Sequence, residues 1–364
     1  MGGITVDLVV WWTQLTTNSG VLLAVGDETG KGHAGVPRVV MVTGASRFLG
    51  GYLVTRLAQD PRIERVIGVD TTAPSKDMLR RMGRAEFVRA DIRNPLLGKV
   101  VRNAEVDTVV HASTLTSAPK SGSRATMKDM NVIGAMQLFA LCQKAPSVRK
   151  VVLRSTAGVY GSTSKDPAKF TEEMGARRRP TGAYARDCIE IEGYLRGLGR
   201  RRPDVDVSIL RLAPVVGAGL NATVARYITS PVVPTIIGRD ARLQFLHEED
   251  ALSALERATV AGPPGTYNVA GDGVVMLSQA IRRAGRIEVP MPTTLFRSAG
   301  RAVMGPIMRS FAAEQLEYFQ FGCALDTTRM RSELGLEPRW TTMQTLDDFL
   351  HASGVRPILT QDWI

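Results

Sequence analysis

The residues with the clearest chemical meaning are the small side chains of a turn near residue 44. A buried apolar strand, Val39–Val42, leads into the run Thr43-Gly44-Ala45-Ser46-Arg47-Phe48-Leu49-Gly50, and a helical pattern follows. Such a turn aims free backbone N–H groups and the positive end of a helix at a pyrophosphate, and glycines let the backbone approach closely. The segment predicts a dinucleotide-binding site, although Arg47 takes one glycine position of the pattern.

An acidic residue stands where the second strand of such a unit should end. The apolar run 65–69 is followed by Asp70, about 20 residues beyond the turn, as the dinucleotide-binding pattern requires. A carboxylate there hydrogen-bonds ribose hydroxyls and repels a 2′-phosphate, so NAD is expected rather than NADP. The alternative is that Asp70 merely caps a loop.

Size and charge narrow the class of protein. The chain has 364 residues, is 44% hydrophobic and carries a formal charge of +11, which predicts a globular protein with one large α/β unit and a smaller lobe. Its basic charge suits anionic partners such as nucleotide-sugar pyrophosphates or acidic lipids. We expect no specific nucleic-acid binding, because the arginine runs 177–179 and 200–202 lack interleaved aromatic side chains.

Cysteine and histidine spacing indicates neither disulfides nor a metal site. The three cysteines and four histidines are scattered without ligand-like spacing. We therefore expect no metal and a reducing cytoplasmic location. No run approaches the roughly 18 apolar residues of a membrane-spanning helix, and residues 1–36 lack the features of a secretory signal.

Strand-like and helical runs alternate from Arg38 to about Leu212. This order predicts a doubly wound, Rossmann-type parallel sheet covered by helices on both faces. The expected strands are Val39–Val42, Val66–Val69, Glu86–Arg89, Thr108–His111, Val151–Ser155 and Val207–Leu212.

We divide the chain into an N-terminal extension at 1–36, expected to be poorly ordered or to lie upstream of the true start, a dinucleotide-binding domain at 37–212 and a mainly substrate-binding lobe at 213–364. Some segments of the lobe should return to the first domain. Helices are expected at Glu248–Ala261 and Leu277–Ala284. The basic amphipathic segment 295–311 is interpreted as a lobe helix, with peripheral membrane contact as the alternative.

Several of these motifs together resemble the extended short-chain dehydrogenase/reductase superfamily, in particular the NAD-dependent epimerase/dehydratase group that includes UDP-glucose 4-epimerases. The resemblance runs from Pro37 to about Leu350. It rests on the turn, on Asp91-Ile92, on His111-Ala112, on Asn131-Val132-Ile133-Gly134 as the start of a helix, and on the run 152–161. Gly265–Val269 and the run 326–338 match the C-terminal lobe of the family.

The resemblance implies a nicotinamide cofactor at the carboxyl edge of the sheet and a homodimer built through two helices. The implied cofactor contacts are Gly44, Ser46, Arg47, Phe48, Leu49, Gly50, Asp70, Asp91, Ile92, His111, Ala112, Asn131 and Tyr184. In compact single-domain relatives, an arginine like Arg47 often favours the 2′-phosphate of NADP. Arg47 therefore either reaches the cofactor phosphates or obstructs them.

The family deprotonates a sugar hydroxyl with the tyrosine of a Tyr-x-x-x-Lys motif, assisted by a serine or threonine. The matching positions are Tyr184 and Thr156, but the lysine position is Cys188. A tyrosine starts near a pKa of about 10, and a neutral thiol one helical turn away does not stabilise its phenolate. Arg186 points to another face of the helix. We therefore expect slow turnover, or turnover shifted to high pH.

Two further departures concern the substrate. Pro214 replaces an asparagine that contacts the sugar nucleotide in UDP-hexose epimerases, and Leu243-Gln244 replaces an Arg-Asp pair. Three hypotheses follow: an NAD-dependent nucleotide-sugar enzyme, most simply a UDP-hexose 4-epimerase; a catalytically degenerate dinucleotide-binding scaffold or sensor; and a dehydrogenase or reductase of a lipid-like alcohol.

Overall fold

The computed structural model describes residues 35–115, 123–220, 222–295 and 313–358, the side chains of 313–316 excepted. The predicted N-terminal extension and the amphipathic segment 295–311 lie almost entirely outside these residues. In the part of the chain that is described, no helix is long and apolar enough to cross a membrane.

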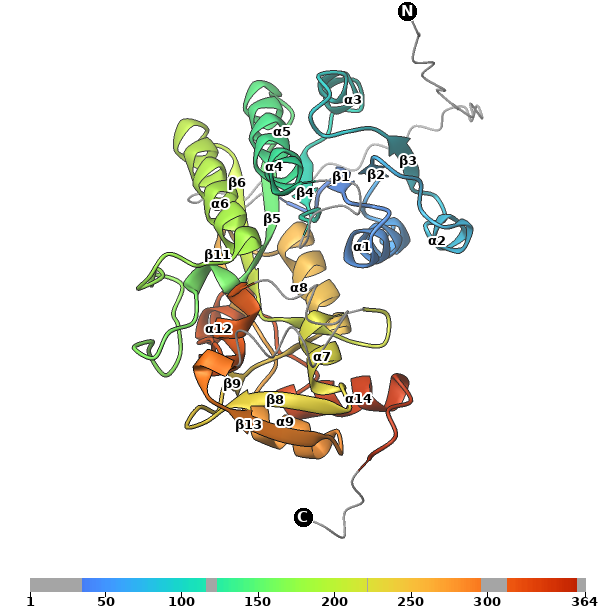
Figure 1. The fold of residues 1–364 in the computed structure, drawn as a ribbon. Helices are drawn as coiled ribbons and strands as arrows, with labels where there is room; N and C mark the ends of the chain where they lie inside the picture. Colours follow the sequence, from blue (N-terminus) through green and yellow to red (C-terminus); the bar gives the residue numbers. More distant parts are fainter. Residues whose placement is uncertain (1–34, 116–122, 221, 296–312, 359–364) are drawn as a thin grey trace, which may run out of the picture. The chain divides into compact units, whose positions relative to one another are not determined.

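A parallel sheet organises the part of the chain that is predicted to bind a dinucleotide (Figure 1). It has seven strands in the order β11-β6-β5-β4-β1-β2-β3, and all its pairs are parallel. The strands are β1 (Val39–Thr43), β2 (Arg65–Asp70), β3 (Glu86–Arg89), β4 (Thr108–His111), β5 (Lys150–Thr156), β6 (Asp206–Leu212) and β11 (Gly265–Val269). The strand order reverses between β1 and β4, which confirms the predicted doubly wound fold.

The last strand of the sheet comes from beyond residue 213. The sequence pattern associated Gly265–Val269 with the lobe, whereas the structure pairs this segment with β6 as β11. Burial explains the placement, because Tyr267, Asn268 and Val269 are all buried. A sheet with helices on both faces can bury its strands in this way.

Helices cover both faces of the sheet (Figure 1). One core contains Val40 and Val42 of β1 with apolar side chains of α1 and α8. A second core contains Val39 and Met41 with side chains of α3, α5 and α6. This division follows from the alternation of side chains along a strand. The helices of this half are α1 (Phe48–Gln59), α2 (Lys76–Arg81), α3 (Leu97–Asn103), α4 (Arg124–Lys128), α5 (Gly134–Lys144), α6 (Ala183–Arg201) and α8 (Glu248–Val260).

The remaining segments build a lobe with its own apolar core, which includes Tyr227, Phe245 and Phe319. Its short strands pair as β10–β7, β12–β9 and β13–β8. They are β7 (Val215–Val216), β8 (Val232–Ile236), β9 (Arg242–Leu243), β10 (Leu246–His247), β12 (Val275–Met276) and β13 (Ile287–Met291). The described helices of the lobe are α7 (Thr223–Ile228), α9 (Leu277–Arg283), α12 (Ala313–Phe321) and α14 (Thr342–Ala352), whereas α13 (Thr328–Ser332) packs its Met330 into the core of the main sheet.

Candidate active site

The turn between β1 and α1 is shaped by two glycines. Gly44 has a φ of +82°, and a Cβ added there would lie 2.8 Å from the Cβ of Ser113, which follows β4. A Cβ on Gly50 would lie 2.2 Å from the carbonyl oxygen of Gly44. The turn is therefore packed against the neighbouring strand end at the point where the strand order reverses, the usual place for a ligand in such sheets.

Asp70 ends β2 beside this turn and is 8% exposed. Its Oδ2 accepts hydrogen bonds from the backbone N–H of Ser46, at 3.1 Å, and from the Ser46 hydroxyl. Its Oδ1 accepts from the N–H of Thr71 at 2.7 Å and from the Thr71 hydroxyl at 3.3 Å. These four bonds occupy about all the lone pairs of a carboxylate. A ribose hydroxyl would therefore have to replace one of the two side-chain donors.

One groove collects many of the predicted cofactor residues. Its lining includes Gly44, Arg47, Asp70, Asp91, Ile92 and Asn131. Arg47 precedes α1 with an extended backbone (φ −95°, ψ 158°), so this position does not need a glycine conformation. Its exposed side chain lies at the same groove as two carboxylates.

Asp91 is already held by a neighbouring arginine. Arg93 Nη2 donates to Asp91 Oδ2 at 2.6 Å, and the Arg93 N–H donates to Oδ1 at 2.9 Å. The hydrogen bonds from Arg93 lower the pKa of Asp91, against the opposing effect of burial. The carboxylate is therefore fixed in position at the rim of the groove.

Asn131 does not open a helix, contrary to the sequence prediction. It lies in a π-helical turn, Asp129–Ile133, between α4 and α5. The helix begins earlier because Ser123 and Thr126 form a capping box at the start of α4. The Asn131 amide holds the chain after β4: Leu115 N donates to Asn131 Oδ1 at 2.8 Å, and Asn131 Nδ2 donates to Leu115 O at 3.0 Å.

His111 is buried at the end of β4. Its Nδ1 lies 2.8 Å from Thr43 Oγ1, and its ring packs edge-on against Phe139. Burial and, secondarily, the charge of Arg154 lower the pKa of His111 to about 4. The ring is thus neutral and part of the interior. That positions 111 and 112 contact the cofactor stays a prediction.

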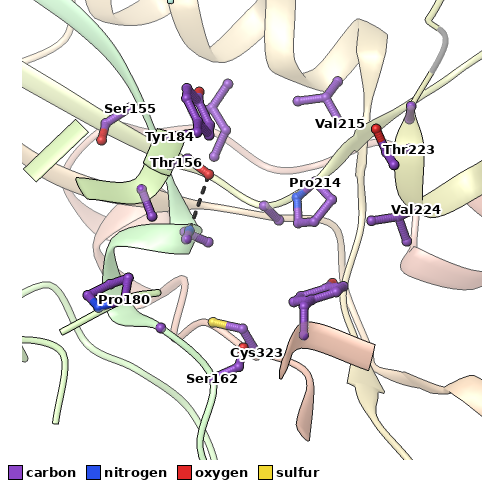
Figure 2. Close-up of a pocket in the computed structure, with 18 of the residues that line it drawn as sticks. Ser155, Thr156, Ser162, Pro180, Tyr184, Pro214, Val215, Thr223, Val224 and Cys323 are labelled. Carbon is purple, nitrogen blue, oxygen red and sulfur yellow. Dashed lines mark hydrogen bonds between the residues drawn. The ribbon is translucent and has the colours of Figure 1, made fainter. Parts of the chain in front are cut away.

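A separate cavity of about 380 Å³ brings together the two residues predicted to be catalytic. Thr156 reaches it from the end of β5 and Tyr184 from the first turn of α6. Figure 2 shows these two side chains close together, with Pro214, Val215 and Thr223 on the other side. Leu49 of α1 also lines the cavity, which therefore adjoins the helix of the dinucleotide turn. Its volume is typical of small-molecule sites.

Thr156 is oriented by the backbone that follows it. Its Oγ1 accepts a hydrogen bond from Gly158 N at 3.2 Å, drawn as a dashed line in Figure 2. A hydroxyl can accept and donate at the same time. The Thr156 hydroxyl hydrogen can therefore be directed at a hydroxyl bound in the cavity.

Tyr184 lies in a low-dielectric position. Burial, and next the neighbouring Cys188, raise the pKa of the Tyr184 phenol above its ordinary value, while Arg154 opposes the rise. Burial raises the pKa of the Cys188 thiol to about 12, so this side chain is neutral near pH 7. Position 188 therefore supplies no positive charge to the Tyr184 phenolate.

A buried polar network fixes the strand that carries Thr156, and sequence reasoning missed its central residue, Glu192. The Ser155 hydroxyl donates to Glu192 Oε1 at 2.6 Å. Arg211 Nη2 donates to Glu192 Oε2 at 2.9 Å, and Arg211 Nη1 donates to the Tyr160 hydroxyl at 2.8 Å. Burial alone would raise the pKa of Glu192, but Arg211 holds it below its ordinary value. The available signal was spacing, since residues 184, 188 and 192 share one face of a helix.

Of the residues that depart from the family pattern on the substrate side, Pro214 lies at the cavity and Gln244 does not. Pro214 lines the cavity beside apolar residues such as Leu212, Val215 and Val224. Gln244 is buried outside it, where its amide donates to Gly271 O at 2.9 Å and accepts from Leu325 N at 2.8 Å. Arg242 donates to the carbonyls of Pro167 and Ala168.

Comparison with known sequences identifies the family. The sequence model of the NAD dependent epimerase/dehydratase family matches residues 40–270, more than half of the chain. The chain belongs to this family, as the sequence motifs predicted. It is 58% identical over 327 residues to an uncharacterized protein of Mycobacterium tuberculosis (strain H37Rv), covering 90% of this chain and 87% of that protein.

Similarity to proteins of known activity is lower. The UDP-glucose 4-epimerase of Mycolicibacterium smegmatis is 28% identical over 318 residues, covering 82% of this chain and 93% of the epimerase. A Thermotoga maritima UDP-glucose 4-epimerase structure with UDP-glucose has a TM-score of 0.66 at 19% identity, covering 87% of this chain and 98% of that one. A Bacillus anthracis dTDP-glucose 4,6-dehydratase structure with NAD has a TM-score of 0.66 at 20% identity, covering 87% of this chain and 96% of the dehydratase. These structures establish a shared fold.

Proposed function

We propose that this protein is an NAD-dependent enzyme that oxidises a hydroxyl of a nucleotide sugar, most simply a UDP-hexose 4-epimerase. The observation that carries the proposal is that Thr156 and Tyr184 line one cavity, which adjoins the helix of the dinucleotide turn through Leu49. Family membership supports it. Cytoplasmic location and homodimerisation stay predictions.

The residues present fit a dinucleotide. The close approach of Gly44 and Gly50 leaves a backbone surface at the start of α1 for a pyrophosphate. Asp70 lies at the groove where a ribose would bind, and its negative charge favours NAD over NADP. Arg47 lies at the same groove, from which its guanidinium can meet the phosphates.

In the proposed reaction, Tyr184 takes the proton of the substrate hydroxyl and later returns it. Thr156 donates a hydrogen bond that holds this hydroxyl against the phenol oxygen. NAD, when bound, would supply a reversible acceptor for the hydride of the alcohol carbon, which returns to that carbon in an epimerisation. The buried network of Ser155, Glu192 and Arg211 keeps the end of β5 in place while the proton moves.

A second substrate class is favoured by the cavity wall. Pro214 and its apolar neighbours offer few donors to a nucleoside diphosphate, and the carboxylate of Glu317 also lines the cavity, where it accepts from the Thr181 hydroxyl at 3.0 Å. These features suit a lipid-like alcohol. The same NAD-dependent chemistry would then act as a dehydrogenase or reductase.

The test begins with calorimetric titration of nucleotide-stripped protein with NAD and then with NADP. We expect tighter binding of NAD. Binding of neither would mean that Arg47 obstructs the turn, and would favour a catalytically degenerate scaffold. Turnover is then measured with UDP-glucose, UDP-galactose and long-chain alcohols.

The assignment of Tyr184 is tested in the same assay. Tyr184→Phe should lower turnover by about 10²- to 10⁴-fold, the usual contribution of a general acid–base group. Tyr194→Phe is the matched control, because Tyr194 lies on the same helix and is 39% exposed. Unchanged turnover in Tyr184→Phe would exclude this tyrosine as the base.

A further inference from the structure

Tyr184 needs a positive charge that its own helix does not supply. The residue one turn along α6, Cys188, is buried and neutral near pH 7. Arg186 is no substitute, because its Nη1 donates to Thr181 O at 2.8 Å and it lines a different cavity from Tyr184. A phenolate at the cavity therefore requires a cation from another element.

Strand β5 brings such a cation to the cavity. Arg154 stands two residues before Thr156, and its side chain lines the cavity with Thr156 and Tyr184. Its Nη1 donates to Ala112 O, at the end of β4, at 3.3 Å. Through this bond the guanidinium of a β5 residue is held beside the end of the neighbouring strand β4.

The charge of Arg154 is not neutralised nearby. Among the described residues no carboxylate forms an ion pair with it, and its buried Nε has no hydrogen-bond partner there. Arg154 is half-buried, and removing even part of a guanidinium from water without a counter-ion costs free energy. A group nearby that becomes negative during function would offset this cost.

Three titratable groups around Arg154 respond to its charge. It opposes the rise in pKa of Tyr184 and of Cys188 on α6, and it contributes to the lowered pKa of His111 on β4. His111 is neutral, so Arg154 is the cation acting on the phenol from β4 and β5, while Cys188 faces it from α6 and the Glu317 carboxylate of α12 lines the same cavity. The geometric support is that Arg154 and Tyr184 line one cavity and that the guanidinium is bonded to Ala112 O beside it.

We propose that Arg154 is the positioning residue that stabilises the Tyr184 phenolate, and that strand β5 thereby supplies the positive charge missing at Cys188. The proposal rests on the proposed function in which Tyr184 is the acid–base group. Ionisation of Tyr184 would therefore place a negative charge beside the half-buried guanidinium and form a neutral pair.

The experiment measures the ionisation of Tyr184 directly. A fluorinated tyrosine, intrinsically more acidic than tyrosine, is incorporated at position 184 of the full chain, and its ¹⁹F resonance is followed against pH. In Arg154→Gln the titration midpoint should rise by about one pH unit or more, the usual effect of an opposite charge nearby. Arg154→Lys should retain a midpoint near that of the native chain.

Two further variants sharpen the test. Arg186→Met removes a neighbouring arginine of α6 and should leave the midpoint unchanged. Cys188→Lys in the Arg154→Gln background should lower it again. If the glutamine variant does not fold, Arg154→Met removes the same charge. A midpoint that does not rise in a folded, charge-neutral variant overturns the proposal.

The titration separates this proposal from the proposed function, because it needs no substrate. A raised midpoint with no turnover on any alcohol would support the role of Arg154 and contradict the enzymatic function. If turnover is lost in Tyr184→Phe but the titration midpoint does not change in Arg154→Gln, the enzymatic function is supported and the role of Arg154 is contradicted.

Discussion

Two regions of the carboxyl edge of the sheet, on either side of β4, differ in how closely they follow the family pattern. At β1 and β2, Gly44, Gly50 and Asp70 form a tightly packed dinucleotide turn. At β5 and α6, Thr156 and Tyr184 keep their types, but Cys188 and Pro214 remove a cation and a polar donor. Cofactor binding and substrate chemistry can therefore change separately within one fold, because different strand ends supply them.

The largest expected effect is on the β5 side. Glu192→Gln would leave Arg211 buried without its counter-charge, so the free energy of unfolding should fall by about 3 to 5 kcal/mol. Chemical denaturation measures it. Glu190→Gln is the control on the same helix: both side chains of its ion pair with Lys128 are partly exposed, so the loss should be below about 1 kcal/mol. Equal effects would show that the network does not support the strand.

His111, on β4 between the two regions, should make stability depend on pH. Its pKa is about 4 in the folded protein and about 6.5 when unfolded. Between these values the unfolded chain binds more protons, so its contribution, about 3 kcal/mol, is complete above pH 6.5 and is lost as the pH falls to 4.

Denaturation at pH 7.5 and pH 4.5 checks this expectation. His111→Gln should lose that part of the pH dependence, whereas His351→Gln should keep it because His351 is exposed. A native pH dependence retained in His111→Gln would show that other groups cause it.

Gly50→Ala tests the packing of the dinucleotide turn. The new Cβ would meet Gly44 O at 2.2 Å, and strain of this kind costs about 1 to 3 kcal/mol. We expect at least about a tenfold loss of NAD affinity, with the β5 side unchanged. In Gly193→Ala, where the Cβ meets nothing within 4 Å, stability should rise by about 0.5 to 1 kcal/mol. Undiminished NAD binding in Gly50→Ala would place the cofactor elsewhere.

The smallest expected effect concerns cofactor choice. Asp70→Asn removes the charge that would repel a 2′-phosphate, so the preference for NAD over NADP should fall by about tenfold, or about 1.4 kcal/mol. Calorimetry with both dinucleotides measures the ratio. Asp77→Asn, at an exposed ion pair with Arg81, should not alter it. A preference that survives in Asp70→Asn would assign selectivity to Arg47 or to the groove as a whole.

Much of the architecture was predictable from the sequence. The strand Glu86–Arg89 has the predicted bounds, and the run Val66–Val69 lies within β2, because turns and apolar runs act locally. The prediction that Asn131 begins a helix was wrong, because a capping box farther upstream begins the helical segment earlier. Strand β11 was associated with the lobe, because a short apolar run does not specify its partner strand.

The sequence by itself determined the family, the turn and the positions of Thr156 and Tyr184, because these depend on residue types at fixed spacings. Only the tertiary structure brought Arg154 to the cavity of Tyr184 and joined Ser155, Glu192 and Arg211 in one network. The physical reason is that electrostatic interactions depend on distance and burial. Residues far apart in the chain come within a short distance of one another, and are buried together, only when strands and helices pack.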